Sequence, residues 1–279
     1  MCFGAVGILS SLLRSFYERN HFILKGYRVV LPALKKDYRL VFLTDLHNHS
    51  FGTNNALLRR AIDQLAPDGI LIGGDMPTVK RGFHMDQALR LCRELAKKYP
   101  VFYANGNHES RLHWERKSFG DLYEAWEGML KKAGVYVLGD QRALVEEDLC
   151  ILGLELEKKY FTRRSRWSLT SEEIRDRIGS PVKGRCNILL AHSPLFGEAY
   201  RAWGADLTLS GHFHGGTIRL GPHRGLMTPQ FQFFYPCCAG GFQRGNMVHI
   251  VGAGLGTHSV NLRLNNPPEI VVLDLKKGR

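Results

Sequence analysis

The fold of this chain follows from the stretch LVFLTDLH at residues 40–47, where an apolar run ends in a carboxylate and an imidazole. The run at 40–44 is short, rich in β-branched and aromatic residues, and typical of a buried strand. Four similar runs also end in polar side chains: 69–72, 101–104, 186–191 and 206–210. Because ligands in open α/β sheets collect beyond the carboxyl ends of the strands, we expect these side chains to gather in one crevice.

Five short blocks of metal-binding residue types follow these runs. In chain order they are Asp45-Leu46-His47, Gly74-Asp75, Gly106-Asn107-His108-Glu109, His192 and Gly211-His212-Phe213-His214. Carboxylate, amide oxygen and imidazole suit Mn, Fe or Zn, and the blocks contain no thiolate, which argues against a single structural zinc. The glycines permit the tight turns and close backbone approach that a phosphate site uses.

This ordered pattern resembles the calcineurin-like metallophosphoesterase superfamily, whose hallmark is D-x-H, G-D, G-N-H-[E/D], H and G-H-x-H. All five blocks occur here, and the resemblance runs from about residue 38 to about residue 275. It implies two ligand sets that share Asp75: Asp45, His47, Asp75 and His214 for one ion, and Asp75, Asn107, His192 and His212 for the other. It also implies that His108 faces the substrate, where it stabilises the phosphoryl oxygens or protonates the leaving group.

Two divalent ions in such a site can share a water, lower its pKa and clamp both oxygens of an in-line displacement. We therefore expect a metal-dependent phosphoric ester hydrolase, a phosphodiesterase or pyrophosphohydrolase, in which a hydroxide bridging two ions attacks phosphorus. Mn²⁺ is the first choice of cofactor, with Fe, Zn or another transition metal as alternatives. Arg111, His113 and His49 are the candidates for substrate contact, because they lie beside the blocks in sequence.

One position departs from the family pattern. Many relatives carry a second acidic residue shortly after G-D, and this chain has Thr78 there. In the family, the second acidic residue is not a metal ligand. We therefore expect altered support around the ligands or altered substrate contact, and no lost ion.

The C-terminal part carries three further motifs, SGHFHGG at 210–216, GAGLGT at 252–257 and LRLNNPPEI at 262–270. They are similar to a bacterial membrane-associated phosphodiesterase branch that includes enzymes like UDP-2,3-diacylglucosamine pyrophosphatase. The resemblance implies a phosphate-ester substrate that is membrane-proximal or a nucleotide-linked lipid.

Two other functions remain open. The net charge of +12 suggests a nucleotide phosphodiesterase or a nuclease-like enzyme, whose binding would weaken steeply with salt. No nucleic-acid-binding module is recognisable in the sequence, so we expect no specific nucleic-acid partner. A non-catalytic scaffold that keeps the fold is the other alternative, although such scaffolds tend to lose ligands and this chain retains all of them.

Length and composition indicate one large domain, since 279 residues with 44% hydrophobic content can bury a sizeable core. Helices are predicted at 54–65, 84–98, 121–133 and 171–178, and closely spaced strands at 135–138, 143–147 and 149–154. This alternation predicts an α/β fold, which the resemblance refines to a four-layer α/β/β/α sandwich of two mixed sheets flanked by helices. The metallophosphoesterase domain would span 38–279, after an N-terminal apolar or amphipathic segment and a lead-in strand at 1–37.

The N-terminal segment is apolar at residues 2–13, which is far short of the ~20 residues that span a bilayer. One helix face can hold Val6, Leu9, Leu13, Phe16 and Tyr17. Such a face lies on a membrane or docks on the core, and both alternatives stay open. Six cysteines without C-x-x-C spacing favour a reducing cytoplasm, with the inner face of the membrane as a peripheral site. The oligomeric state is left open.

Two segments combine features of binding surfaces. Residues 158–167, KKYFTRRSRW, suit an anionic headgroup surface or a polyanionic substrate, or they form a solvated loop. Residues 231–242, FQFFYPCCAGGF, can line an acyl-chain groove or touch a membrane, or they pack against the body of the protein.

Overall fold

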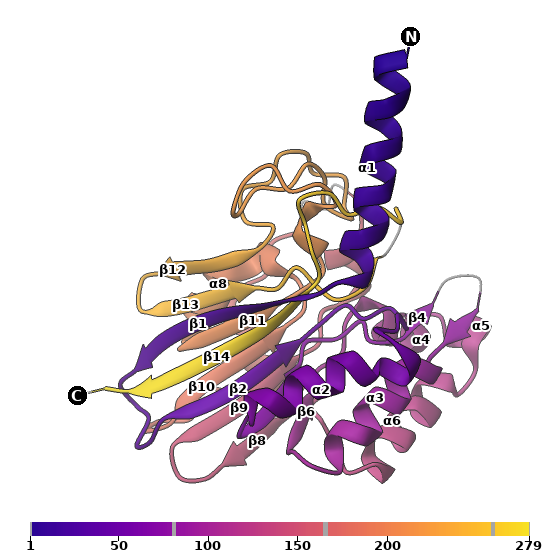
Figure 1. Ribbon diagram of the computed structural model, residues 1–279. Coiled ribbons are helices and arrows are strands. Elements are labelled where there is room, and N and C mark those ends of the chain that lie inside the picture. Colours follow the sequence, from indigo (N-terminus) through magenta and orange to yellow (C-terminus); the bar gives the residue numbers. More distant parts are fainter. Residues whose placement is uncertain (1, 80–81, 164–166, 258–259, 279) are drawn as a thin grey trace.

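Two six-stranded sheets pack against each other at the centre of the molecule (Figure 1). The computed structural model describes residues 2–79, 82–163, 167–257 and 260–278, with the backbone alone for residues 2–8. The first sheet contains, in spatial order, β1 (Ile23–Leu31), β14 (Glu269–Lys277), β2 (Tyr38–Leu43), β3 (Gly69–Ile72), β6 (Val101–Tyr103) and β7 (Tyr136–Val137). The second contains β12 (Gly240–Arg244), β13 (Met247–Val251), β11 (Leu207–Ser210), β10 (Cys186–Ala191), β9 (Leu149–Leu154) and β8 (Arg142–Val145). A small hairpin of β4 (Thr78–Val79) and β5 (Phe83–His84) lies apart from both sheets.

Both sheets are mixed, as predicted. In the first, β14 runs antiparallel to β2, and the remaining neighbours are parallel. In the second, the outer pairs β12–β13 and β8–β9 are antiparallel around a parallel centre. The parallel strands β2, β3 and β6 therefore end at one edge of their sheet, and β10 and β11 end together in theirs.

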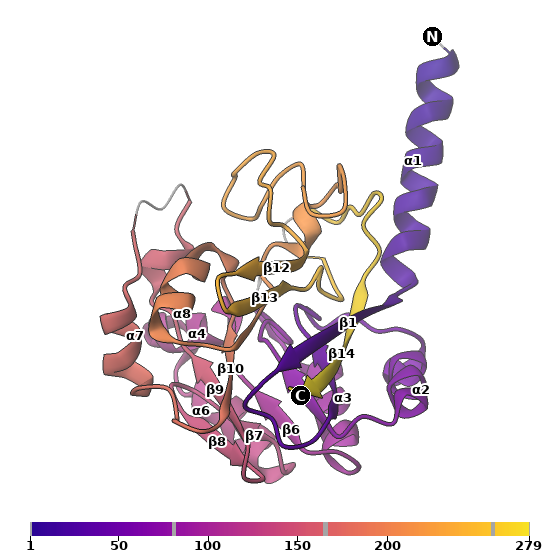
Figure 2. The same ribbon diagram turned by 90° about the vertical axis from the view of Figure 1, so that its left-hand side faces the viewer.

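Helices cover the outer face of each sheet and complete the four-layer α/β/β/α sandwich predicted above. The first sheet carries α2 (Ala56–Leu65), α3 (Asp86–Ala96) and α6 (Leu122–Lys132), and the second carries α7 (Ser171–Ile178) and α8 (Gly197–Trp203). Figure 2 shows α2 on one side of the sheets and α7 and α8 on the other. Side chains alternate between layers, because Val41 packs under the helices while the next residue, Phe42, packs between the sheets. Each such fully buried side chain contributes roughly 1.5–3 kcal/mol.

Each predicted helix is present, with ends shifted by no more than two residues. The N-terminus of α7 has a clear cause, because the Thr170 side chain accepts the Glu173 N–H at 3.2 Å and the Glu173 carboxylate accepts the Thr170 N–H at 2.8 Å. Three helices were not predicted: α8, α4 (Asn107–Trp114) and α5 (Arg116–Phe119). Short 3-10 turns occur at η1 (Thr53–Asn55), η2 (Lys158–Phe161), η3 (Pro194–Phe196) and η4 (His214–Gly216).

The backbone of the N-terminal helix α1 (Cys2–Asn20) projects from the body, and the base of the helix lies against the body (Figures 1 and 2). Most of the exposed side chains of α1 are apolar, namely Leu9, Leu12, Leu13, Phe16 and Tyr17, and Ser10 and Arg14 are exposed as well. Ser15 and Glu18, in contrast, are buried. The apolar face is therefore not docked on the core, and the side chain of Val6 lies outside the described set. Within the described residues, no helix combines the length and apolar character that crossing a bilayer requires.

Candidate metal centre

The five polar blocks lie directly after β2, β3, β6, β10 and β11, where the sequence predicts them. Because these strands end at neighbouring edges of the two sheets, their polar side chains meet in one buried place. Among the described residues, three groups of side chains have ligand atoms within 4.8 Å of one another: Asp45, His47 and His214; His47, Asp75 and His108; and Asp75, His192 and His212. The structure thus brings six of the seven predicted ligands together. His108, which was not predicted as a ligand, lies in the same place.

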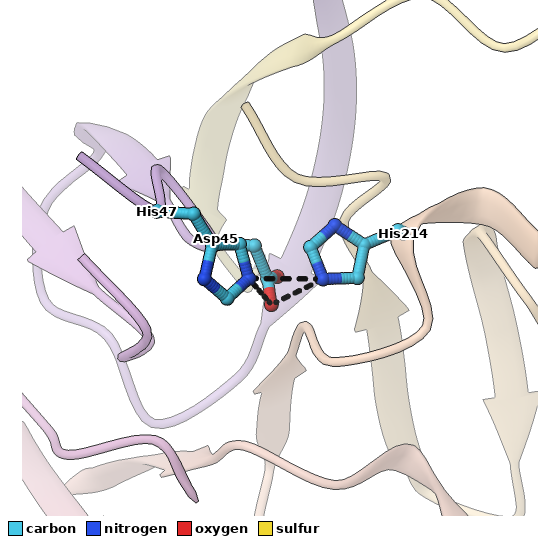
Figure 3. A group of neighbouring side chains, drawn as sticks. All are labelled: Asp45, His47 and His214. Carbon is cyan, nitrogen blue, oxygen red and sulfur yellow. Dashed lines mark hydrogen bonds and ion pairs between the residues drawn. The ribbon is translucent and has the colours of Figure 1, made fainter. Parts of the chain in front are cut away.

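Asp45, His47 and His214 form the first of these groups (Figure 3). The Nε2 atoms of His47 and His214 are 3.1 Å apart, and His214 Nε2 is 3.4 Å from an Asp45 carboxylate oxygen. Asp75 links this group to the other side of the site, since its Oδ2 is 3.9 Å from His47 Nε2 and 3.2 Å from His192 Nε2. The carboxylate of Asp75 is therefore placed between two clusters of imidazoles.

The seventh predicted ligand, Asn107, is the first residue of α4. Its side-chain oxygen is shielded from solvent and has no hydrogen-bond partner among the described residues. A buried carbonyl-type oxygen without a partner costs free energy unless a cation or donor compensates it. The donor set of carboxylates, imidazoles and one amide oxygen consequently fits divalent cations.

Five of these residues have positive φ angles: Asp45 (55°), His47 (46°), Asp75 (53°), His212 (66°) and His214 (49°). Positive φ is uncommon for residues other than glycine, and each instance costs of order 1–3 kcal/mol. Such strained residues cluster at functional sites, where the surrounding structure holds them. Here the left-handed turns direct polar side chains back into the crevice as soon as each strand ends.

Glycine is required at two contact points beside the carboxylates. A Cβ atom on Gly106 would collide with the Asp75 carboxylate, and one on Gly211 would collide with the carboxylate of Asp45. The two glycines of the G-N-H and G-H-x-H blocks therefore allow neighbouring loops to approach the acidic side chains closely.

The charges of the site are strongly coupled. Burial raises the pKa of Asp45 to about 6, and nearby His192 opposes this shift. Burial also raises the pKa of Asp75, but the neighbouring imidazoles, His192 first among them, outweigh it, and the pKa lies well below its usual value. Burial lowers the pKa of His192, whereas Asp75 and Asp45 raise it more strongly, to about 10. The crevice thus stabilises positive charge between its two carboxylates.

Backbone carbonyls orient two of the imidazoles. His192 Nδ1 lies 2.7 Å from the Gly73 carbonyl oxygen, and His214 Nδ1 lies 3.3 Å from that of Gly256. A carbonyl only accepts hydrogen bonds, so Nδ1 carries a proton and Nε2 is the nitrogen that faces the site. Metal-binding histidines are commonly fixed in this way.

Glu109 is a supporting residue of the site. Its carboxylate accepts the backbone N–H groups of Asp75 (2.9 Å), Met76 (3.1 Å) and Gly106 (3.0 Å), together with the hydroxyl of Tyr103. Burial, reinforced by the charge of Asp75, raises the pKa of Glu109 to about 7. The contribution of Tyr103 was not predicted, because nothing in the strand sequence marks its hydroxyl as a partner of Glu109.

The three predicted substrate contacts lie in different surroundings. His49 lines a polar pocket together with His47 and with Arg19 and Asn20 of α1. Arg111 donates to Glu115 at 2.9 Å and to the Val79 carbonyl at 3.2 Å. The ring of His113 packs edge-on against Tyr123. A substrate role of these three residues stays a prediction.

An apolar pocket also adjoins the metal centre, next to the polar pocket, with which it shares Thr257. His214 forms part of its wall, and the remaining wall includes Phe213, Met227, Phe231, Val260 and Leu262. Phe233 and Phe234, from the same aromatic segment, are 59% and 57% exposed and thus do not pack into the body.

The basic segment at 158–167 borders the site near His212. The ring of Phe161 lies 5.1 Å from that of His212, and the Arg163 guanidinium lies 4.2 Å above the ring of Phe231. Lys158 and Lys159 pair with Glu115 and Glu157. Residues 164–166 lie outside the described residues.

Comparisons with known proteins agree with the five-block pattern. The profile of a family described as calcineurin-like phosphoesterase matches residues 38–216. An uncharacterized metallophosphoesterase of Campylobacter jejuni is 28% identical over 256 residues, which cover 90% of this chain and 63% of that protein. Phosphodiesterase YaeI of Escherichia coli is 26% identical, covering 85% and 82%, and the uncharacterized metallophosphoesterase YkuE of Bacillus subtilis is 26% identical, covering 88% and 82%. The family match and the His/Asp groups together imply that the protein binds divalent metal ions.

Proposed function

This chain belongs to the calcineurin-like phosphoesterase family, and on that premise we propose that it is a dinuclear metal-dependent phosphodiesterase or pyrophosphohydrolase. Its general class, a phosphoric ester hydrolase, agrees with the family and with the relative named phosphodiesterase YaeI. The observation that carries the proposal is the position of Asp75, whose Oδ2 approaches both His47 and His192. A carboxylate between two imidazole clusters is what a bridging ligand requires.

The two proposed ion sites share Asp75. Asp45, His47, Asp75 and His214 would hold one ion, and Asp75, Asn107, His192 and His212 the other. The short distances within each group and the buried oxygen of Asn107 support this division. Two divalent ions, Mn²⁺ by preference, would acidify a water and neutralise the charge of phosphoryl oxygens.

His108 would donate a hydrogen bond to the substrate. Its Nδ1 accepts the backbone N–H of Val79 at 2.8 Å, so the proton of the neutral ring is on Nε2. Nε2 is the atom that can face the centre formed with His47 and Asp75. A second proton on Nδ1 would break the bond from Val79. This geometry favours stabilisation of a phosphoryl oxygen over full proton transfer to the leaving group.

We further infer that the substrate is amphiphilic, a membrane-proximal or nucleotide-linked lipid of the type cleaved by UDP-2,3-diacylglucosamine pyrophosphatase. A polar pocket lined by His47 and an apolar pocket lined by His214 both adjoin the metal centre, and the two pockets share Thr257. A phosphate ester with a polar group on one side and an acyl chain on the other matches this arrangement. The exposed apolar residues of α1, including Leu13 and Phe16, would lie on a membrane surface as a peripheral contact.

The test compares three substrates with metal-free protein to which Mn²⁺ has been returned: a simple phosphodiester, a phosphomonoester and a UDP-linked acylated sugar. Preference for the acylated UDP-sugar supports the lipid proposal, while turnover of the simple diester alone leaves a broader phosphodiesterase. Asp75→Asn serves as the inactive control. Failure to hydrolyse any of the three esters would contradict the proposed function.

A further inference from the structure

The base of α1 is hydrogen-bonded to residues 263–266, far away in sequence. The Ser15 hydroxyl accepts the Arg263 backbone N–H at 3.1 Å. The two carboxylate oxygens of Glu18 accept the N–H groups of Asn265 at 3.1 Å and of Asn266 at 2.8 Å. Because Ser15 and Glu18 are buried, these bonds are shielded from competing water.

Asn266 extends this contact to the metal centre. Its side-chain amide is fully buried and donates to the backbone carbonyl of His214 at 2.6 Å, while its oxygen accepts from Arg219 at 2.9 Å. His214 adopts a left-handed backbone conformation, which needs such external contacts to persist. Glu18 therefore helps to fix the position of Asn266, and Asn266 in turn holds the backbone of His214.

Arg263 provides a second connection to the same histidine. Its buried guanidinium donates to the carbonyl of Gly256 at 2.6 Å, and to those of Ala253 and Asn266 at 2.9 and 3.1 Å. Gly256 is also the acceptor beside His214 Nδ1, and its N–H donates to the Asp45 carbonyl at 2.6 Å. The ring of His214 thus depends on the same segment that α1 holds.

We propose that Glu18 is a positioning residue of the metal centre, which acts through Asn266 on His214. In this role, the base of α1 is a structural part of the ion site that contains His214. The inference rests on the proposed dinuclear centre and adds to it a residue outside the five metal-binding blocks.

The test is a Mn²⁺ titration of metal-free full-length protein by calorimetry, comparing the unaltered chain with Glu18→Gln. A glutamine has one acceptor oxygen for two N–H donors, so one of them loses its partner. Loss of an outer partner of a metal ligand typically weakens affinity ~10–100-fold, and we expect at least ~10-fold weaker binding of one ion, with the other unchanged. Excess Mn²⁺ should then restore turnover.

Arg14→Gln is the matched control. Arg14 pairs with Glu18 at 2.8 Å from the exposed side, and its removal leaves both bonds to Asn265 and Asn266 in place. Mn²⁺ affinity should therefore be unchanged in this variant. Asn266→Asp removes the donor to His214 while leaving Glu18 intact, and it should show the same weaker Mn²⁺ binding as Glu18→Gln. This variant tests the proposal if Glu18→Gln does not fold.

The outcomes separate this inference from the proposed function. If the unaltered chain binds fewer than two Mn²⁺ ions, the dinuclear centre itself is wrong. If it binds two, and folded Glu18→Gln or Asn266→Asp binds both as tightly, the positioning role is wrong. A lowered melting temperature with unchanged Mn²⁺ affinity would assign Glu18 a purely structural role and overturn the inference.

Discussion

The Nε2 atoms of His47 and His214 lie 3.1 Å apart, although 167 positions separate the two residues in sequence. His47 follows β2 of the first sheet and His214 follows β11 of the second, so the contact joins the two sheets at their carboxyl ends. Two imidazole nitrogens at this distance, next to the Asp45 carboxylate, create a place where a cation is favourable.

Replacement of His108 by alanine should slow turnover without loss of metal. The side chain would donate to a phosphoryl oxygen, and removal of such a group typically costs ~10²–10⁴ in rate. The measurement is kcat toward a phosphodiester together with the Mn²⁺ content of the same sample. A fall in metal content would show that His108, which lies in one group with His47 and Asp75, is a ligand.

Glu109→Gln should loosen the loop that carries Asp75. Glutamine cannot accept all the bonds from Asp75, Met76, Gly106 and Tyr103, so at least one buried donor is left without a partner, at about 1–3 kcal/mol. We expect a lower melting temperature and weaker Mn²⁺ binding. Tyr103→Phe, which removes one hydrogen bond only, is the milder control. Equal effects of the two substitutions on Mn²⁺ affinity would contradict this role of Glu109.

His249 should make the protein sensitive to acid. Burial and the neighbouring Arg244 lower its pKa from 6.5 to about 3, so the unfolded chain binds a proton more readily than the folded one. Stability is therefore complete above about pH 6.5 and falls as the pH drops toward 3, with a slope of at most ~1.4 kcal/mol per pH unit for this group.

The check on His249 is a series of thermal melts between about pH 7.5 and about pH 4.5. This range includes the pKa of about 6.5 that the histidine has in the unfolded chain. His249→Gln can still hydrogen-bond to Ser210, whose hydroxyl oxygen lies 2.9 Å from His249 Nε2, but it does not titrate. Its melting temperature should fall less steeply than that of the unaltered chain. Parallel curves would exclude His249 as a source of the acid sensitivity.

The exposed face of α1 should bind lipid. Leu13 and Phe16 are 63% and 64% exposed, and burial of each in a membrane interface would contribute up to about 1.5–3 kcal/mol. The double variant Leu13→Ser/Phe16→Ser should sediment with phosphatidylglycerol-containing vesicles at least ~10-fold less than the unaltered chain. Leu144→Ser, at an exposed position on β8, is the control for lost surface hydrophobicity. Equal sedimentation of all three proteins would rule out this membrane contact.

The strand ends were predictable because each apolar run stops at a polar block. The predicted limits of β3, β9 and β10 coincide with those of the structure, since these strands are buried on both faces and contain almost only apolar residues. The helix α4 was missed because it begins inside the G-N-H-E block. Its first residue, Asn107, belongs to that polar block, and the helix shows little apolar periodicity.

The contacts of α1 could not be predicted from its sequence. Its helical pattern predicts an apolar contact face that includes Leu13 and Phe16. In the structure, Ser15 and Glu18 face the body instead, because they accept hydrogen bonds from backbone N–H groups at 263–266. That demand arises from a loop about 250 positions away, and it becomes apparent only when the chain is folded. The buried guanidinium of Arg263 escaped prediction for the same reason, since its acceptors are carbonyl groups that any residue possesses.

The most direct test of a dinuclear phosphodiesterase is hydrolysis of a simple phosphodiester by metal-free protein during stepwise addition of Mn²⁺, with the Asp75→Asn variant in parallel. Activity should rise until two ions per chain are bound and then level off. Asp75→Asn should remain at least ~10³-fold less active, a loss of about 4 kcal/mol, because the shared carboxylate charge is removed. Full activity after one ion per chain, or in Asp75→Asn, would contradict the two-ion centre.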